Sequence, residues 1–476
     1  MSNFDPAELA EQLRDRVQLG MPHTVDRLAR LVRIPSVSWD GFDPAHVRAS
    51  AERVRELFEG TGLFDEVGIH QYDIAEGTPG QPGVIARREA SPGWPTVLLY
   101  AHHDVQPPGR DELWDTPAYE PTLVGDRLYG RGASDDKAGV LLHVAALETL
   151  HDLWEAKNER FPLGVSVFIE GEEENGSGSF TKFLDAHREA LGADYIIVAD
   201  SDNAAIDVPA LTVALRGNVT FNLTVRTLRH ASHSGMFGGA APDAMLAAVR
   251  LLDTLWAEDG SVAVEGLAAH DAPVPDMPEA QLVEEAGVVG GQLLGSGPVL
   301  ARTWYQPSIT VTGIDAPDVA NASNTLIPEV RVRISARIAP GTDAEAAAEA
   351  LQQHLRAHAP FGAEVEFDSL NTGRPFLVDV DGDGVERMRA AMAESWGAEA
   401  QLSGIGGSIP FIADLVDRFP HSQILVTGVE DPATRAHSPN ESQHLGVLHR
   451  AILTEATFLA DLALNPPKAG ETGERE

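Results

Sequence analysis

A short acidic segment is the first sign of chemistry in this sequence. The stretch FIEGEEENGSGSF, residues 168–180, places Glu170, Glu172, Glu173 and Glu174 within five residues, directly after an apolar run. Carboxylates this close repel one another and raise each other's pKa unless positive charge lies among them. The segment is therefore either a solvated surface turn or one side of a cation site.

Histidine and carboxylate residues also follow the other short apolar runs, PTVLLY, ADYIIVAD and SQILVTGV, or open a predicted helix. Each of these residues alone has an ordinary explanation as a helix cap or a hydrogen-bonded structural group. In an open α/β sheet, however, ligands bind at the carboxyl ends of the strands, and histidine with carboxylates is a metal-ligand set. The residues that together indicate a metal site are His102, His103, Asp104, Asp135, Asp136, Glu172, Glu173, Glu174, Asp200, Asp202 and His437.

The composition excludes several other kinds of chemistry. The chain has no cysteine, so disulfides, thiolate metal sites and cysteine nucleophiles are ruled out. It contains no GxSxG elbow, Walker loop, GxGxxG fingerprint or HExxH helix. A net charge of −37 argues against nucleic acid and anionic membranes as partners. The acidic N-terminus lacks the basic and apolar regions of a signal peptide, and no apolar run reaches about 20 residues, so we expect a cytoplasmic protein.

The pattern of elements predicts an α/β fold with an insertion. Apolar runs that do not alternate with polar residues are separated by helical segments, which indicates a mixed sheet covered by helices on both faces. After Pro209 the pattern changes to long alternating strands, such as ALTVALRGNVTFNLTVRTL and EVRVRISARI, with helices between them. We therefore predict a catalytic domain in two parts, residues 1–209 and 372–476, and an inserted α+β domain, residues 210–371. Helices are expected over residues 6–32, 135–154, 180–190, 243–256, 343–359, 385–396 and from 440 onward.

At this point the chain resembles a known family, the co-catalytic dinuclear zinc metallopeptidases. This family includes carnosinase, cytosolic non-specific dipeptidase, aminoacylase, acetylornithine deacetylase and succinyl-diaminopimelate desuccinylase. The resemblance covers nearly the whole chain, in order. It rests on the motifs His102-His103-Asp104-Val105-Gln106-Pro107, Gly130-Arg131-Gly132 with Asp135-Asp136-Lys137, Glu172-Glu173-Glu174-Asn175-Gly176, His233-Ser234-Gly235, Gly406-Gly407-Ser408-Ile409-Pro410 and Ala436-His437-Ser438.

The resemblance implies a role for each site residue. His102 and Asp200 would hold one divalent metal, Glu174 and His437 the second, and Asp135 would bridge the two. Asp104 would orient His102, and Glu173 would be the general base in hydrolysis by a metal-bridged hydroxide. Asp202 stays open as an alternative ligand to Asp200. Zinc is the expected metal, with manganese or cobalt as alternatives.

The inserted domain resembles the family's lid, through which two chains form a homodimer. His233 would stabilise the oxyanion in the partner's site and bind substrate there, and Arg337 and Ser408 would bind the substrate carboxylate. A guanidinium suits this task because it pairs with a carboxylate through two hydrogen bonds.

The resemblance is closest to the dipeptidase branch, and it implies hydrolysis of dipeptides or similar small peptides with a free carboxylate. An aspartate at position 200 is typical of that branch, whereas deacylases usually carry glutamate. Gly404-Ile405 stands where dipeptidases commonly have Arg-Glu, which leaves the recognition of the substrate's amine end open. Two alternatives remain: a deacylase of N-acetyl or N-succinyl amino acids, and a catalytically dead binding or scaffold protein.

Overall fold

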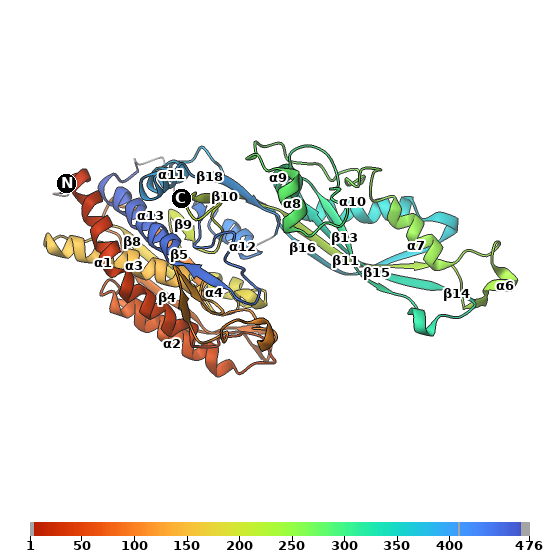
Figure 1. Ribbon diagram of the computed structural model, residues 1–476, viewed down its shortest axis with the longest axis horizontal. Coiled ribbons are helices and arrows are strands. Elements are labelled where there is room, and N and C mark those ends of the chain that lie inside the picture. The colour runs from red at the N-terminus through yellow and green to blue at the C-terminus, as the bar shows by residue number, and fades with distance from the viewer. Residues whose placement is uncertain (1–3, 408–409, 468–476) are drawn as a thin grey trace. The chain divides into compact units, whose positions relative to one another are not determined.

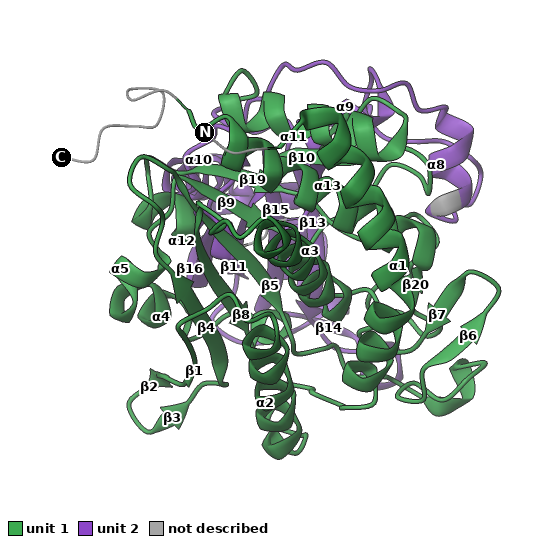
Figure 2. Cartoon of the chain, turned by 90° about the vertical axis from the view of Figure 1, so that its left-hand side faces the viewer, with its two compact units in different colours: residues 1–213, 379–403, 414–476 green, residues 214–378, 404–413 purple. Residues whose placement is uncertain are grey.

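The computed structural model describes residues 4–407 and 410–467 of the chain. Two compact units account for them (Figure 2). Unit 1 consists of residues 1–213, 379–403 and 414–476, and unit 2 of residues 214–378 and 404–413. The divisions after Val213 and Val378 lie a few residues beyond the predicted limits at 209 and 371, and the separate piece 404–413 was not predicted.

Unit 1 contains a mixed sheet with the strand order β1-β4-β8-β5-β9-β19-β10 (Figure 2), and Figure 1 labels β4, β5, β8, β9 and β10 of it. The four central strands β8, β5, β9 and β19 run parallel to one another. The pairs β1–β4, β4–β8 and β19–β10 are antiparallel. Its strands are β1 (Glu66–His70), β4 (Gly83–Arg88), β5 (Thr96–His102), β8 (Gly164–Glu170), β9 (Tyr195–Val198), β10 (Ala210–Leu215) and β19 (Gln423–Val426), with smaller pairings of β2 (Asp73–Ala75), β3 (Thr78–Pro79), β6 (Thr122–Val124), β7 (Arg127–Tyr129) and β20 (Ser442–His444).

Every residue of β5 and of β8 is buried, which shows that both faces of this sheet are covered. Helix α3 packs on β5 and contacts α1 and α13, while Phe183 of α4 packs against Phe168 of β8. The helices of unit 1 are α1 (Pro6–Val32), α2 (Pro44–Gly60), α3 (Lys137–Ala156), α4 (Phe180–Ala186), α5 (Arg188–Leu191), α11 (Asp383–Trp396) and α13 (Leu445–Leu464), with the 3-10 helices η1 (Asp111–Leu113) and η2 (Glu173–Asn175). Strand β18 (Gln401–Ile405) and helix α12 (Pro410–Arg418) span the divisions between the units.

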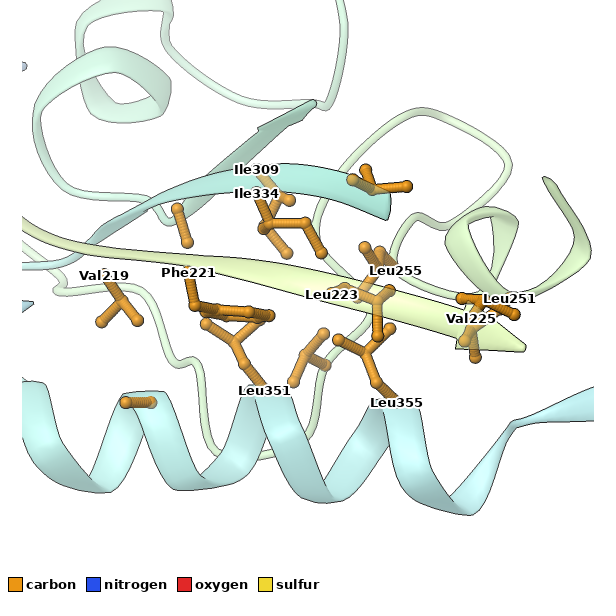
Figure 3. Packing of buried hydrophobic residues seen from close by; sticks show 14 of the residues in the cluster. Val219, Phe221, Leu223, Val225, Leu251, Leu255, Ile309, Ile334, Leu351 and Leu355 are labelled. Atoms are coloured by element: carbon orange, nitrogen blue, oxygen red, sulfur yellow. The ribbon is translucent and has the colours of Figure 1, made fainter. Parts of the chain in front are cut away.

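Unit 2 is built on an antiparallel sheet with the order β13-β15-β11-β16. Burial alternates along β11, so one face of the sheet is buried and the other is not. Helices α7 and α10 pack on the buried face, where Leu351 and Leu355 of α10 meet Phe221 and Leu223 of β11 (Figure 3). Its elements are β11 (Gly217–Arg226), β12 (Ser232–His233), β13 (Ser308–Asp315), β14 (Thr325–Leu326), β15 (Glu329–Ile338), β16 (Glu364–Gly373), β17 (Phe376–Leu377), α6 (Ser234–Phe237), α7 (Ala244–Asp253), α8 (Glu279–Glu285), α9 (Val299–Trp304), α10 (Ala344–Ala357), η3 (Val319–Asn321) and η4 (Pro360–Gly362).

The predicted fold class, a mixed-sheet catalytic domain with an inserted α+β domain, is confirmed. One prediction about the strands needs correction: the alternating segment ALTVALRGNVTFNLTVRTL is two strands, β10 and β11, which separate at Arg216. Strand β10 belongs to the large mixed sheet and β11 to the sheet of unit 2. None of the helices in residues 4–407 and 410–467 is long and apolar enough to cross a membrane.

Candidate metal centre

The carboxyl ends of the parallel strands in unit 1 bring the predicted ligands together. His102 is the last residue of β5, and Asp200 follows β9 by two residues. Glu173 and Glu174 form the start of η2 just after β8. Asp135 comes shortly before α3, and His437 lies in the loop between β19 and β20. His102, Glu173, Glu174 and Asp200 lie at or just after the end of a strand, which is the pattern that the sequence shows.

Two overlapping groups of these side chains have the spacing of a metal site. One group is His102, Glu173 and Asp200, and the other is His102, Asp135 and Glu174; within each group the potential ligand atoms all lie within 4.8 Å of one another. His437 completes the second group, because its Nε2 atom lies 3.2 Å from Glu174 Oε2.

Asp135 lies between two imidazoles. Its Oδ1 atom is 3.1 Å from His102 Nε2, and its Oδ2 atom is 2.9 Å from His437 Nε2. Each carboxylate oxygen therefore faces a different histidine, which is the arrangement that a bridging ligand needs. Burial alone would raise the pKa of Asp135, but the hydrogen bonds from both histidines outweigh it and hold that pKa below its ordinary value.

Burial and mutual repulsion raise the pKa values of the other carboxylates of the centre. Burial raises the pKa of Glu174 to about 7, and the charge of Asp135 adds to the rise. Burial likewise raises the pKa of Asp200 to about 6. The pKa of Glu173 rises well above its ordinary value because the side chain is buried and lies near Asp200. Divalent cations among these groups would remove the repulsion, so the donor set fits a metal centre.

The pKa values of both histidines, His102 and His437, are also raised, because both share hydrogen bonds with carboxylates, which outweigh the effect of burial. Hydrogen bonds to Asp135 and Glu174 raise the pKa of His437 to about 11. The side chain of His437 is 58% exposed, whereas those of Asp135 and Glu174 are 7% and 2% exposed. The centre is thus closed by protein on the Asp135 and Glu174 side and accessible at His437.

Asp104 contacts residues of both groups of candidate ligands. Its Oδ1 atom is 3.4 Å from His102 Nδ1 and also accepts the backbone N–H of Glu173 at 3.1 Å. Its Oδ2 atom accepts the N–H of Glu174 at 3.2 Å and the hydroxyl of Ser38 at 2.7 Å. The buried carboxylate therefore fixes one ligand histidine and the backbone of both glutamates.

The structure distinguishes Asp200 from Asp202. Asp200 Oδ1 lies 3.9 Å from His102 Nε2, inside the first group of candidate ligands. Asp202 instead pairs with Glu430, both through a β-bridge and through their side chains. This geometry supports Asp200 as the ligand.

Three predicted substrate residues belong to unit 2 or lie outside the described residues. His233 ends β12, is exposed, and accepts the N–H of Gly235 at its Nδ1 atom. Arg337 lies on β15. Burial lowers the pKa of Arg216, and the nearby positive charge of Arg337 lowers it further. Ser408 lies outside the described residues.

Four further residues near the centre were not predicted as site residues: Gln106, Arg131, Glu430 and Glu441. The Gln106 side chain donates to Glu174 Oε2 at 2.6 Å. Burial and the charges of Asp135, Asp202 and Asp200 raise the pKa of Glu430 well above its ordinary value. Gln106 and Arg131 stand inside the motifs that carry the resemblance, whereas nothing in the local sequence distinguishes Glu430 or Glu441.

Comparison with known proteins identifies the class of protein. The family model for peptidase family M20/M25/M40 matches residues 98–462. A cysteinylglycine-S-conjugate dipeptidase of Corynebacterium striatum is 34% identical over 382 residues, which cover 79% of this chain and 83% of that protein. A β-Ala-His dipeptidase of Rattus norvegicus is 27% identical, with 82% of each chain covered.

Solved structures show the same fold. The dipeptidase Dug1p from Saccharomyces cerevisiae superposes with a TM-score of 0.75 at 22% identity, covering 96% of this chain and 99% of that chain. Human carnosine dipeptidase 1 superposes with a TM-score of 0.73 at 23% identity, covering 96% and 99%. The chain belongs to peptidase family M20/M25/M40. It is a metal-dependent hydrolase of dipeptides, which confirms the predicted family, enzyme class and reaction.

Proposed function

We propose that this dipeptidase uses a dinuclear centre in which Asp135 bridges two divalent cations, with His102 and Asp200 on one side and Glu174 and His437 on the other. The observation that carries the proposal is the position of Asp135, whose two oxygens each face one histidine. A carboxylate that served one ion would not need a histidine at each oxygen. Zinc suits this set of histidine and carboxylate ligands, as do manganese and cobalt.

Two divalent cations held here would supply Lewis acidity toward the attacking water and the scissile carbonyl. Glu173 then acts as general base, taking a proton from the water and giving it to the leaving nitrogen. Asp104 holds the backbone N–H of Glu173 and so fixes where this base can reach.

The substrate is a dipeptide with a free carboxylate, such as the Cys-Gly conjugates or β-Ala-His for which the relatives are named. Arg337 and Ser408 are the proposed partners of that carboxylate, and His233 is the proposed oxyanion donor to the partner's site in a homodimer. Arg216 supports the loop that leads to Ser408, since its Nε donates to Gly406 O at 3.0 Å. The cytoplasmic location stays a prediction.

Metal analysis combined with a substrate panel tests the proposal. We expect about two divalent ions per chain, loss of hydrolysis in chelator, and recovery with zinc, manganese or cobalt. The panel is Cys-Gly, an S-alkyl Cys-Gly, β-Ala-His, and the matched N-acetyl and N-succinyl amino acids. Full activity of metal-free protein in chelator would contradict the metal mechanism, and one ion per fully active chain would contradict the dinuclear centre. Preference for the acyl amino acids would indicate the deacylase alternative.

A further inference from the structure

A fully buried ion pair lies next to the metal centre and has no part in the mechanism given above. Arg131 Nη1 donates to Glu441 Oε2 at 2.6 Å, and the two side chains are 1% and 0% exposed. Transferring two charges out of water costs so much free energy that such a pair contributes little net stability. The pair is therefore better explained by what its remaining hydrogen bonds hold in place.

Glu441 accepts hydrogen bonds from the loop that carries Asp135. Its Oε2 atom accepts the N–H of Gly132 at 3.0 Å, and its Oε1 atom accepts the N–H groups of Ser134 at 3.1 Å and Asp135 at 3.2 Å. With Arg131, both oxygens are occupied by donors from residues 131–135. The backbone of the proposed bridging ligand is thus fixed by a carboxylate near the other end of the chain.

Arg131 connects the same pair to two other ligand-bearing loops. Its Nη2 atom donates to Pro107 O in the loop after His102, at 3.4 Å. The same atom donates to Ser438 O, the carbonyl directly after His437, also at 3.4 Å. The guanidinium lies over the ring of Trp114, which covers it. Loops carrying His102, Asp135 and His437 therefore all meet at one ion pair.

The loop around His437 has a conformation that needs such support. Arg435, His437 and Asn440 all have positive φ angles, of 61°, 59° and 65°, although none is glycine. Residues with side chains occupy this region only when their surroundings enforce it. If the contacts at Ser438 and Glu441 were lost, we expect the backbone of residues 435–440 to adopt a different conformation, and His437 would move with it.

We propose that the Arg131–Glu441 pair is a positioning device that sets the distance between Asp135 and His437, and with it the affinity of the second metal position. Neither residue touches substrate or metal in this assignment; both act through the loops that they join. The inference rests on the proposed dinuclear centre, which assigns Asp135 and His437 as ligands.

The test is metal affinity in Glu441→Gln, measured for Zn²⁺ and for Mn²⁺ alone by competition with a chromophoric chelator. Glutamine keeps the shape, but its amide nitrogen cannot accept the N–H groups that one glutamate oxygen accepts. We expect at least tenfold weaker binding of one of the two ions, a smaller effect on the other, and a lower kcat with little change in KM at saturating metal. Arg131→Lys, which keeps the charge but not the planar fork, is expected to weaken the same ion in the same direction.

Glu455→Gln is the matched control, because Glu455 is also a buried acid in unit 1 and pairs with His143 at 2.8 Å. Thermal unfolding of metal-free protein should show both variants destabilised, while only Glu441→Gln loses metal affinity. Unchanged affinity in Glu441→Gln and Arg131→Lys, or an equal loss in Glu455→Gln, would overturn the inference. A wild-type chain that binds one ion would overturn the dinuclear centre instead, and the variants would still decide the pair's role at that ion.

Discussion

At the scale of single residues, neighbouring side chains of the same type have different surroundings. Glu173 and Glu174 are adjacent, yet Glu174 lies beside His437 and Asp135, whereas Glu173 lies with His102 and Asp200. Asp104 accepts the backbone N–H of each, so the two carboxylates are held at fixed places rather than exchanging roles.

This difference predicts opposite outcomes for two substitutions. Glu173→Gln should keep both metals and lose several orders of magnitude in kcat, because an amide cannot accept the water's proton. Glu174→Ala should lose one metal ion. Metal content and kcat of both variants check the prediction. Loss of metal in Glu173→Gln with retention in Glu174→Ala would mean that the roles are shifted by one residue.

Metal binding should be linked to protons in a direction set by the pKa values. In metal-free protein, burial raises the pKa of Glu174 to about 7 and of Asp200 to about 6, and hydrogen bonds to Asp135 and Glu174 raise that of His437 to about 11. Below each value the group is protonated, and the metal must displace that proton. Affinity should therefore fall as the pH falls from 8 to 6, while the number of protons released rises.

Calorimetric titration with Zn²⁺ in buffers of different ionisation enthalpy measures this release directly. The matched comparison is wild type against His437→Ala, which lacks the group expected to release its proton even at pH 8. A release that does not change between pH 8 and 6 would contradict the assignment of Glu174 and Asp200 as ligands.

At the scale of elements, the sequence predicts best where a pattern repeats. The amphipathic helix over residues 6–32 was predicted with the bounds that α1 has, because polar and buried positions alternate with helical period. The candidate ligands were found because they follow buried strands, where an α/β sheet presents its binding edge. The local sequence indicates the clusters, and the family resemblance assigns a role to each residue in them.

Features that depend on distant contacts were missed. The alternation of apolar residues runs through Arg216, but the chain changes sheets there, and the guanidinium binds Gly406 O and Gln306 O. A helix was expected from residue 440, but Glu441 is held by residues 131–135 and α13 begins only at Leu445. These partners lie between 90 and 310 positions away in the sequence, so no local pattern indicates them.

The segment after β19 (Gln423–Val426) passes so close to the segment after β9 (Tyr195–Val198) that only glycine fits at position 428. A Cβ atom on Gly428 would lie 1.6 Å from Ser201 O, the carbonyl next to Asp200. Gly428→Ala should therefore force the two strand ends apart, cost about 1–3 kcal/mol of unfolding free energy, and reduce metal content. Urea unfolding and metal analysis check both effects.

Gly20→Ala is the control for this substitution, because Gly20 is exposed in α1 and a Cβ atom there would meet nothing within 4 Å. Alanine in a helix interior should raise stability by up to about 1 kcal/mol. Equal behaviour of the two variants would show that the close approach of β19 and β9 does not constrain the centre.

At the scale of the whole molecule, the proposed dimer predicts that two inactive variants restore activity when their chains are combined in one dimer. If His233 acts in the partner's site, then homodimers of His233→Ala and of Glu173→Ala are both inactive. A mixed dimer, however, has one site with an intact Glu173 and an intact His233 from the other chain. Random exchange makes half the dimers mixed, each with one complete site of two, so activity should recover to about a quarter of wild type.

Unfolding and refolding the two variants together, followed by a dipeptidase assay, measures this recovery. Mass spectrometry of intact dimers confirms that subunits have exchanged. Refolding of each variant alone gives the baseline. Exchange without recovery would mean that His233 serves its own chain or has no role in the reaction.

The interleaving of the two units has a consequence for biosynthesis. Nearly all of unit 2 is one continuous stretch, residues 214–378, whereas unit 1 needs the first 213 residues together with residues 379–403 and 414–476. As the chain leaves the ribosome, the core of unit 2 can form while α13 and the loop of His437 are still untranslated. Until roughly the last eighth of the chain is synthesised, Asp135 and the neighbouring carboxylates therefore lack the positive charge of His437. A nascent chain stalled before residue 437 should therefore carry a folded unit 2 and an incomplete metal centre.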